Sequence, residues 1–296
     1  MDLTFVHGTL DPASDPQGYA AVWQRGPSAV AIGKFDGVHR GHRALLTRLK
    51  VEARRLGCQA GVVTFDAPPL EVLHRVQAAR LTTLSDRRAL CAELGLDFLL
   101  ALRSTPELFA TEADEFVEVL IAALNARIIV VGADFRFGRA ARGNVQTLRS
   151  VASRFGVEVI GVGLHEQAGR RVSSTRIREV LAAGDVEGAA ELLGRPYSLT
   201  SRAYSGTAVS LSVHIEDHTA MPAPGVYLAR IAFSTPSQGG AVVAKVFDAT
   251  DGRRRLRLRS LQGELDAATS GRPCTVVFER SAQRTSHAVK AAVSAH

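Results

Sequence analysis

The sequence of 296 residues is poor in cysteine and in aromatic residues, and it contains no long hydrophobic run. Its three cysteines, Cys58, Cys91 and Cys274, are widely separated, so we expect reduced, packed thiols rather than a disulfide framework or a C-x-x-C zinc site. No apolar run approaches the ~20 residues that a membrane span needs. Because residues 1–3 also lack the basic and then apolar pattern of a signal segment, we expect a cytoplasmic protein without membrane contact.

Two common phosphate-binding motifs are missing as well. A Walker loop at Gly33-Lys34 would need Gly at position 28 and Ser or Thr at position 35, where the chain has Ser28 and Phe35. A dinucleotide fingerprint at Gly161-Val-Gly163 fails because Glu166 stands where its third glycine should be. A phosphate-binding function must therefore rest on another motif.

No metal site is expected from the histidines. His214 and His218 are four residues apart, but Leu211, Val213 and Ile215 alternate as in a β-strand. On a strand the two imidazoles would lie about 13 Å apart, which is too far for one zinc ion.

The residues that are present indicate folded cores, with 46% hydrophobic residues and a mean hydropathy of +0.06. After a loop-like stretch over residues 1–28 with one short amphipathic piece at Tyr19–Trp23, apolar runs alternate with helical patterns as far as about residue 163. We expect strands at 29–33, 60–65, 97–102, 127–132 and 157–163. We expect helices near 41–56, 85–94, 112–125 and 145–155, with Ser85 and Thr111 as N-caps. The alternation predicts an α/β fold, a parallel sheet with helices on both faces.

The last third of the chain is β-rich and predicts a second domain. We expect strands at 208–216, 225–233, 241–247, 254–260 and 273–279, separated by Gly, Pro, Ser and Asp. The boundary is expected between residues 196 and 197.

The most informative stretch is Ala29–His42, which reads AVAIGKFDGVHRGH. Its apolar start predicts a buried strand that stops at Gly33, and a helix with Gly57 as its C-terminal cap begins after the turn. His39 and His42 then lie three residues apart on the first turn of this helix. Backbone amides and the positive end of the helix dipole attract an anion there, and two imidazoles add hydrogen bonds. The alternative for either histidine alone is a solvated surface residue.

Two further stretches follow predicted strand ends. Gly132–Gly138, reading GADFRFG, combines an acid, a cation and two aromatic rings; it is either a binding loop or a tight turn with Phe135 or Phe137 folded into the core. Ser173–Arg178, reading SSTRIR, begins another helix and offers either an ordinary N-cap or a second phosphate site.

These three stretches together resemble one family. Gly33–His42 contains the HxGH signature of the nucleotidylyltransferase superfamily and resembles its FAD synthetase branch, Gly132–Gly138 resembles the family's GxDFxFG loop, and Ser173–Arg178 resembles its SSTxIR motif. The resemblance extends from about residue 28 to residue 197. It implies a Rossmann-like domain that uses ATP with Mg²⁺ and takes FMN as its second substrate, so that the partners are small molecules.

The resemblance also implies roles for individual residues. The implied catalytic residues are His39, His42 and Arg178. The implied nucleotide-binding residues are Gly33, Phe35, Asp36, Gly37, Gly41, Gly132, Asp134, Ser174 and Thr175. The implied flavin-binding residues are Phe65, Asp66, Phe135, Phe137, Arg142 and Asn144. No protein metal ligand is implied.

The chain departs from the family pattern in two places. Where the family usually has F-x-P-H-P, the chain has Phe65-Asp66-Ala67-Pro68-Pro69, so Pro68 replaces an imidazole. Bacterial relatives usually continue into a riboflavin kinase barrel, and Pro222–Tyr227 resembles its P-x-x-G-V-Y turn, but the kinase's P-T-A-N motif is missing between Tyr197 and Pro222. We expect a barrel of this type that has lost kinase activity, because positioning and electrostatics supply nearly all of phosphoryl-transfer catalysis.

The net charge of +7 is concentrated near the C-terminus, where residues 197–296 carry 12 Lys and Arg against 7 Asp and Glu. Arg255, Arg257 and Arg259 alternate with leucines, which predicts a strand with buried leucines and a row of guanidiniums. No aromatic residue is interleaved with them, so we expect a solvated sheet face rather than a nucleic-acid interface.

Three functions agree with these patterns. The first is transfer of AMP from ATP to FMN, which yields FAD and pyrophosphate. The second keeps the chemistry but uses another phosphorylated acceptor or a flavin analogue, as Pro68 suggests. The third is a non-catalytic flavin- or nucleotide-binding regulatory protein. The sequence assigns no oligomeric state.

Overall fold

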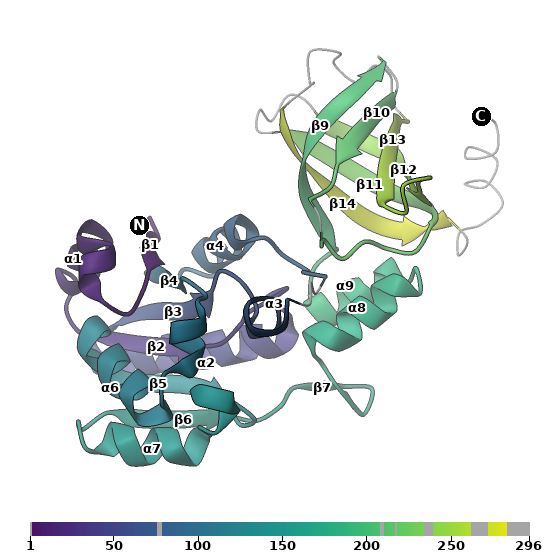
Figure 1. Ribbon diagram of the computed structural model, residues 1–296. Coiled ribbons are helices and arrows are strands. Elements are labelled where there is room, and N and C mark those ends of the chain that lie inside the picture. Colours follow the sequence, from purple (N-terminus) through teal and green to yellow (C-terminus); the bar gives the residue numbers. More distant parts are fainter. Residues whose placement is uncertain are drawn as a thin grey trace. The chain divides into compact units, whose positions relative to one another are not determined.

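The computed structural model describes residues 2–75, 79–207, 210–216, 218–233, 239–261 and 272–282 (Figure 1). The chain forms two compact units. We call the first, Met1–Ala78 with Leu84–Val172, the sheet unit, and the second, Ala79–Thr83 with Ser173–His296, the barrel unit. The boundary expected between residues 196 and 197 stays a prediction, since the two helices before it group with the barrel strands.

The sheet unit is built on a six-stranded parallel sheet in the order β1-β4-β3-β2-β5-β6. The strands are β1 (Thr4–Gly8), β2 (Ser28–Ile32), β3 (Gln59–Phe65), β4 (Phe98–Leu102), β5 (Ala126–Gly132) and β6 (Glu158–Val162). The helices are α1 (Pro16–Trp23), α2 (Arg40–Leu56), α3 (Pro69–His74), α4 (Leu84–Glu93), α5 (Pro106–Ala110), α6 (Ala113–Leu124) and α7 (Val145–Ser153), with short 3-10 turns η1 (Pro12–Ser14) and η2 (Arg139–Ala141). A hairpin of β7 (Glu166–Gln167) and β8 (Arg170–Arg171) completes the unit.

The five strands expected between residues 29 and 163 are confirmed, each within one residue at either end. The expectation that residues 1–28 hold only a loop and a short helix is wrong, because β1 adds a sixth strand at the edge of the sheet. This strand is only five residues long and pairs with β4 alone, so its own sequence carries little periodic signal.

Alternate residues of the central strand β2 enter two separate cores. Val30 and Ile32 pack with side chains of α1, α6 and α7, whereas Ala29 and Ala31 pack with side chains of α2 and α4. All five residues of β2 are buried, as expected for a parallel strand covered on both faces.

Of the three helix caps predicted from the sequence for the sheet unit, one is confirmed and two are wrong. Gly57 caps α2 in the left-handed conformation, with φ 62°, as expected. Thr111 is not the N-cap of α6, because the short helix α5 takes Thr111 as its own C-terminal cap and leaves Glu112 in front of α6. Ser85 is not an N-cap either, because α4 already begins at Leu84.

The barrel unit contains helices α8 (Ser174–Ala182) and α9 (Val186–Leu193) and a closed barrel in the order β10-β13-β12-β11-β14-β9. Its strands, all paired antiparallel, are β9 (Ser198–Thr207), β10 (Ser210–His214), β11 (Gly225–Phe233), β12 (Gly239–Asp248), β13 (Arg254–Ser260) and β14 (Pro273–Ser281). Five of these strands were expected, although residues 208 and 209 of the first lie outside the described part. The strand β9 was not expected, because its ten residues are mostly Ser, Thr, Gly and Arg.

Composition led us to expect reduced cysteines and no membrane-spanning segment. Cys58, Cys91 and Cys274 are all free, which confirms that they form no disulfide framework. Over the described ranges, no helix combines the length and the apolar character that crossing a bilayer demands.

Candidate functional site

The turn between β2 and α2 has an unusual backbone. Phe35 and Val38 have positive φ values of 48° and 39°, a conformation that non-glycine residues rarely adopt, and Gly37 has φ 82°. Such strain costs about 1–3 kcal/mol per residue and persists only where the surroundings enforce it. Here Phe35 is 2% exposed and Val38 is fully buried, so packing holds the turn in this conformation.

His39 is the N-cap of α2. Its Nδ1 accepts a hydrogen bond from the backbone N–H of His42 at 3.3 Å, and its ring is 6% exposed. Because Nδ1 is the acceptor, the proton of a neutral His39 ring lies on Nε2. The cap thereby fixes an Nε2–H donor beside the first amides of the helix, which have no partner within the helix itself.

His42 lies directly on His39, with ring centroids 3.6 Å apart and an angle of 14° between the rings. The Phe35 ring is 5.1 Å from His42 on another side. Burial, together with the nearby charges of His39 and Arg171, lowers the pKa of His42 well below its ordinary value. His42 is therefore neutral at rest, and an anion placed against it would favour its protonation.

A buried arginine donates hydrogen bonds to the turn between β2 and α2. Arg87 of α4 is 6% exposed, and its Nη1 donates to the carbonyl of Lys34 at 3.1 Å, the carbonyl of Phe65 at 2.8 Å and Oγ1 of Thr64 at 2.8 Å. It thus ties the segment after β2 to the segment after β3. Arg87 was not predicted from the sequence, because a single arginine in a helix gives no local signal.

The turn after β2 lies beside the loop after β5, since these two strands are neighbours in the sheet. In that loop Asp134 forms an ion pair with Arg171 of β8 at 2.6 Å. A Cβ on Gly41 would lie 3.2 Å from the His39 ring and 3.5 Å from Cβ of His165, so only glycine fits there without displacement. The hairpin therefore adds Arg171, and the residue before the hairpin, His165, lies beside Gly41; neither was predicted, because strands of two residues have no periodicity.

The loop Gly132–Gly138 lines a hollow of about 360 Å³ together with the start of α7. The lining residues are Ala133, Asp134, Phe135, Arg136, Asn144, Val145 and Gln146. Phe137 is 7% exposed and packs in the core against Phe116, and Phe135 stacks on it at 5.3 Å. The core alternative is thus confirmed for Phe137, whereas Phe135 lines the hollow and its binding role stays a prediction.

Two other residues expected to bind flavin, Arg142 and Asn144, lie between η2 and α7. Asn144 is the N-cap of α7 and accepts hydrogen bonds from the amides of Gln146 and Thr147. Arg142 is exposed at the end of η2. Asn144 lines the hollow, and the flavin-binding roles of both residues stay predictions.

The segment after β3 carries a polar network. Asp66 accepts from Nε2 of His7 at 3.0 Å and from the amide of Ser104 at 2.9 Å, and Phe65 packs 5.9 Å from Phe109. Burial by itself would raise the pKa of Asp66, but the hydrogen bonds from His7 and Ser104 outweigh it and hold that pKa below its ordinary value. His7 was missed because the strand that carries it was missed, and Ser104 was missed because a single serine after a strand gives no local signal.

The three predicted residues of the barrel unit lie together on the first two turns of α8. Ser173 caps this helix through its hydroxyl, which accepts from the amide of Arg176 at 3.2 Å. An Nη2 proton of Arg178 is donated to Oγ1 of Thr175 at 3.4 Å, and Ser174 begins the same turn. Within this unit the motif is thus a helix N-terminus with hydroxyls and a guanidinium on one side.

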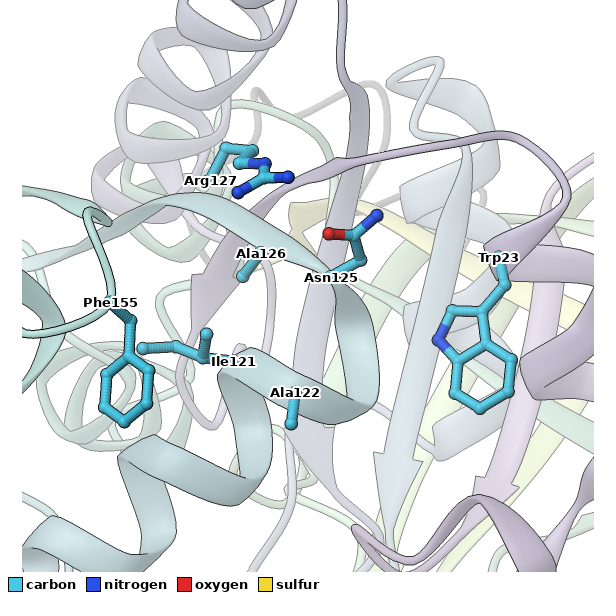
Figure 2. Close-up of a pocket in the computed structure, with 7 residues that line it drawn as sticks. All are labelled: Trp23, Ile121, Ala122, Asn125, Ala126, Arg127 and Phe155. Atoms are coloured by element: carbon cyan, nitrogen blue, oxygen red, sulfur yellow. The ribbon is translucent and has the colours of Figure 1, made fainter.

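A second hollow of the sheet unit lies at the amino end of β5, whereas the first follows the carboxyl end of the same strand (Figure 2). It has a volume of about 440 Å³ and is lined by Trp23, Ile121, Ala122, Asn125, Ala126, Arg127 and Phe155. None of the predicted site residues lies here, and ligands of open parallel sheets bind at the carboxyl ends of the strands instead. Among the described residues no group of three or more His, Cys, Asp or Glu side chains could hold a metal ion.

These features define a class: an α/β protein with a Rossmann-like parallel sheet, a histidine-capped helix at the carboxyl end of its central strand, and a separate closed barrel of riboflavin-kinase type. A family model described as FAD synthetase matches residues 22–176. The bifunctional riboflavin kinase/FMN adenylyltransferase of Pseudomonas fluorescens is 33% identical, over 89% of this chain and 89% of that protein. The chain belongs to the FAD synthetase family.

Other proteins similar to this chain carry similar names, and one solved structure shares its fold. The bifunctional riboflavin kinase/FMN adenylyltransferase of Escherichia coli K12 is 34% identical over 62% of this chain, and the match spans 59% of that relative's length. A putative bifunctional riboflavin kinase/FMN adenylyltransferase of Geobacillus thermodenitrificans is 41% identical, over 58% of this chain and 92% of the relative. A crystal structure described as a macrolide-efflux protein from Streptococcus pneumoniae is 26% identical, with a TM-score of 0.77 over 91% of this chain and 92% of the other.

Proposed function

We propose that the protein transfers AMP from ATP to FMN, giving FAD and pyrophosphate. A phosphate oxygen of FMN attacks the α-phosphorus of ATP, and the bond from that phosphorus to the bridging oxygen of the β-phosphate breaks. The observation that carries the proposal is the stacked pair His39 and His42 at the start of α2, in a chain whose relatives are FMN adenylyltransferases.

The two imidazoles suit the reacting phosphate. They can strengthen their hydrogen bonds to the triphosphate as negative charge grows on it during the reaction. The amides at the start of α2, with Gly33, Gly37 and Gly41 leaving room, hold the same phosphates, and Phe35 and Asp36 shape the turn. Gly132 and Asp134 begin the neighbouring loop, which we assign to the rest of the nucleotide.

The α8 motif suits the leaving pyrophosphate. Arg178 carries a permanent charge, and Ser174 and Thr175 supply hydroxyl groups, a combination that binds phosphate oxygens strongly. We assign the flavin to the hollow beside Phe135 and Asn144, with Phe137 behind it, Arg142 on its rim, and the Phe65-Asp66 segment at the neighbouring strand end.

Mg²⁺ fits this arrangement as a companion of the phosphates. The described residues hold no ready-made cluster of three metal ligands, and Mg²⁺ characteristically keeps several waters while binding substrate phosphates. Bound there, it would neutralise charge on the triphosphate. The residues of this chain orient the substrate phosphates.

We further propose that the barrel has lost riboflavin kinase activity, because the chain has no Pro-Thr-Ala-Asn between Tyr197 and Pro222. A second candidate function keeps AMP transfer but uses another phosphorylated acceptor or flavin analogue. It is favoured by Pro68, which stands where the family usually has an imidazole.

The test is to incubate the protein with Mg-ATP and either FMN or riboflavin, to separate the flavins by chromatography and to measure pyrophosphate. FAD from FMN with unchanged riboflavin is the expected result. FMN formed from riboflavin would contradict the loss of kinase activity. Pyrophosphate release with a different phosphorylated acceptor, but not with FMN, would favour the second function, and tight ATP binding without pyrophosphate from any acceptor would leave a regulatory role.

A further inference from the structure

The barrel carries an exposed basic surface that AMP transfer does not use. Along β13 the leucines Leu256 and Leu258 are buried inside the barrel, and Arg255, Arg257 and Arg259 are exposed, as their alternation predicted. The register of the neighbouring strands decides what surrounds these arginines.

Two cross-strand rows extend this surface. In one row Arg257 lies between Ser212 of β10 and Lys245 of β12, and in the next row Arg259 lies between Ser210 of β10 and Val243 of β12. We define the basic face as Lys245, Arg257 and Arg259 with Ser210 and Ser212. Arg257 and Arg259 are two residues apart on one strand, so their stems are about 6.5 Å apart.

Acidic partners are found only at the edges of this face in the described part of the barrel. Asp248 and Asp251, near the turn that follows β12, pair with Arg254 and Arg255 at 3.0 and 2.6 Å. Within the same described part, Lys245, Arg257 and Arg259 form no ion pair. The basic face therefore keeps its positive charge available for an external anion.

The register also supplies the aromatic residue that the sequence of β13 lacks. Phe247 of β12 is half-buried, and the guanidinium of Arg257 lies 5.6 Å above the centre of its ring. Cations, hydroxyls and an aromatic ring thus lie on neighbouring strands of one outer face of the barrel. Single-stranded nucleic acids are bound by this combination, since cations and hydroxyls take the phosphates and rings or guanidinium planes take the bases.

We propose that the basic face of the barrel binds single-stranded nucleic acid through Lys245, Arg257 and Arg259. An anionic membrane is a weaker match, because Leu261 is the one large hydrophobic side chain exposed among the described residues of the barrel unit. The proposal does not depend on the proposed function.

The test measures the fluorescence anisotropy of labelled 20-nucleotide U and dT oligomers with the full-length protein at 50–300 mM salt. Saturating Mg-ATP and FMN are present, so that the oligomer cannot report on the sites of the sheet unit. We expect the logarithm of the binding constant to fall with the logarithm of the salt concentration with a slope of about −2, because each of three phosphate contacts contributes ~0.7.

The variant Arg257→Thr/Arg259→Thr should weaken binding roughly 10- to 30-fold at 0.1 M salt and reduce the slope by about 1.4. Threonine suits an exposed strand position, so the barrel should be retained, and Lys245→Thr alone gives an independent, smaller loss. The matched control is Arg230→Thr/Arg255→Thr, which removes the same charge from positions that pair with Glu279 and Asp251.

Several results would overturn the proposal. These are no oligomer binding by the wild type at 50 mM salt, equal losses in the test and control variants, oligomer binding that occurs only when Mg-ATP and FMN are omitted, or binding to phosphatidylserine vesicles in place of the oligomers. Loss in the Arg257/Arg259 variant with retention in the control supports it.

Discussion

The starts of α2 and α8 are both expected to bind phosphate, but they differ in backbone conformation, in the capping side chain and in charge. The start of α2 is reached through a turn with positive φ at Phe35 and Val38, and an imidazole caps it. The start of α8 follows an ordinary extended residue, Ser173, with φ −149° and ψ 157°, and a hydroxyl caps it. Arg178 gives α8 a permanent charge, whereas burial keeps His42 neutral at rest.

This difference indicates a division of labour under the proposed function. A permanent charge binds phosphate equally before and during the reaction, which favours holding the nucleotide and its leaving group. Imidazole hydrogen-bond donors held in a rigid frame gain most when charge develops, which favours lowering the barrier. Four changes to single residues or pairs test this division.

The largest effect is expected for His39→Ala/His42→Ala. Removing both donors at the reacting phosphate should lower kcat for FAD formation by roughly 10²- to 10⁴-fold, the range seen for oxyanion donors. Turnover is measured as pyrophosphate release with FMN. His214→Ala, which removes an exposed imidazole in the barrel unit, is the control, and unchanged turnover in the double variant would disprove the assignment of the pair.

A smaller effect is expected for Arg178→Met. Losing one charge-assisted contact should reduce kcat/KM for ATP by about 10- to 100-fold, with much of the change in KM. Arg178→Lys keeps the charge and should recover part of the loss. Glu179→Gln on the same helix is the control; a kcat defect in Arg178→Met as large as that of the double histidine variant would erase the distinction between the two helix starts.

Arg87→Met tests the frame beneath the α2 turn. Because Arg87 donates to the Lys34 and Phe65 carbonyls and to Thr64, its loss should lower the free energy of unfolding by about 2–3 kcal/mol and also lower kcat. Urea unfolding and turnover are measured on the same samples. Arg88→Met, an exposed neighbour whose guanidinium lies over Phe5, should change neither by a comparable amount; a stability loss with normal kcat would show that the turn does not need this support.

The smallest effect concerns the pKa of His42. Since folding lowers this pKa, the unfolded chain binds a proton that the folded chain refuses once the pH falls below about 6.5. The folded state should therefore lose about 1 kcal/mol of stability from this group between pH 7 and pH 5.5. The loss is measured by urea unfolding at both pH values and should disappear in His42→Gln but not in His214→Gln. An identical pH dependence in wild type and His42→Gln would show that His42 titrates normally.

The sequence could predict those parts of the protein that depend on local patterns. Fully buried parallel strands such as β2 are continuous apolar runs, and the cap of α2 at Gly57 follows from a local rule, so both were found. The edge strand β1 and the polar strand β9 were missed because their pairing depends on distant partners, β4 for one and β10 and β14 for the other. Thr111 was misassigned because α5, a helix of five residues, competes for it.

For the site, the sequence by itself determined the candidate residues and the family: the HxGH string and the SSTRIR string need only residue identity and spacing. The tertiary structure decided the surroundings of these residues. It brought Arg87 under the turn, paired Arg171 with Asp134, placed Phe137 in the core, and set Phe247 and Lys245 beside the arginines of β13. Such contacts join residues far apart in the chain, and no periodicity within one segment encodes which distant segment will lie next to it.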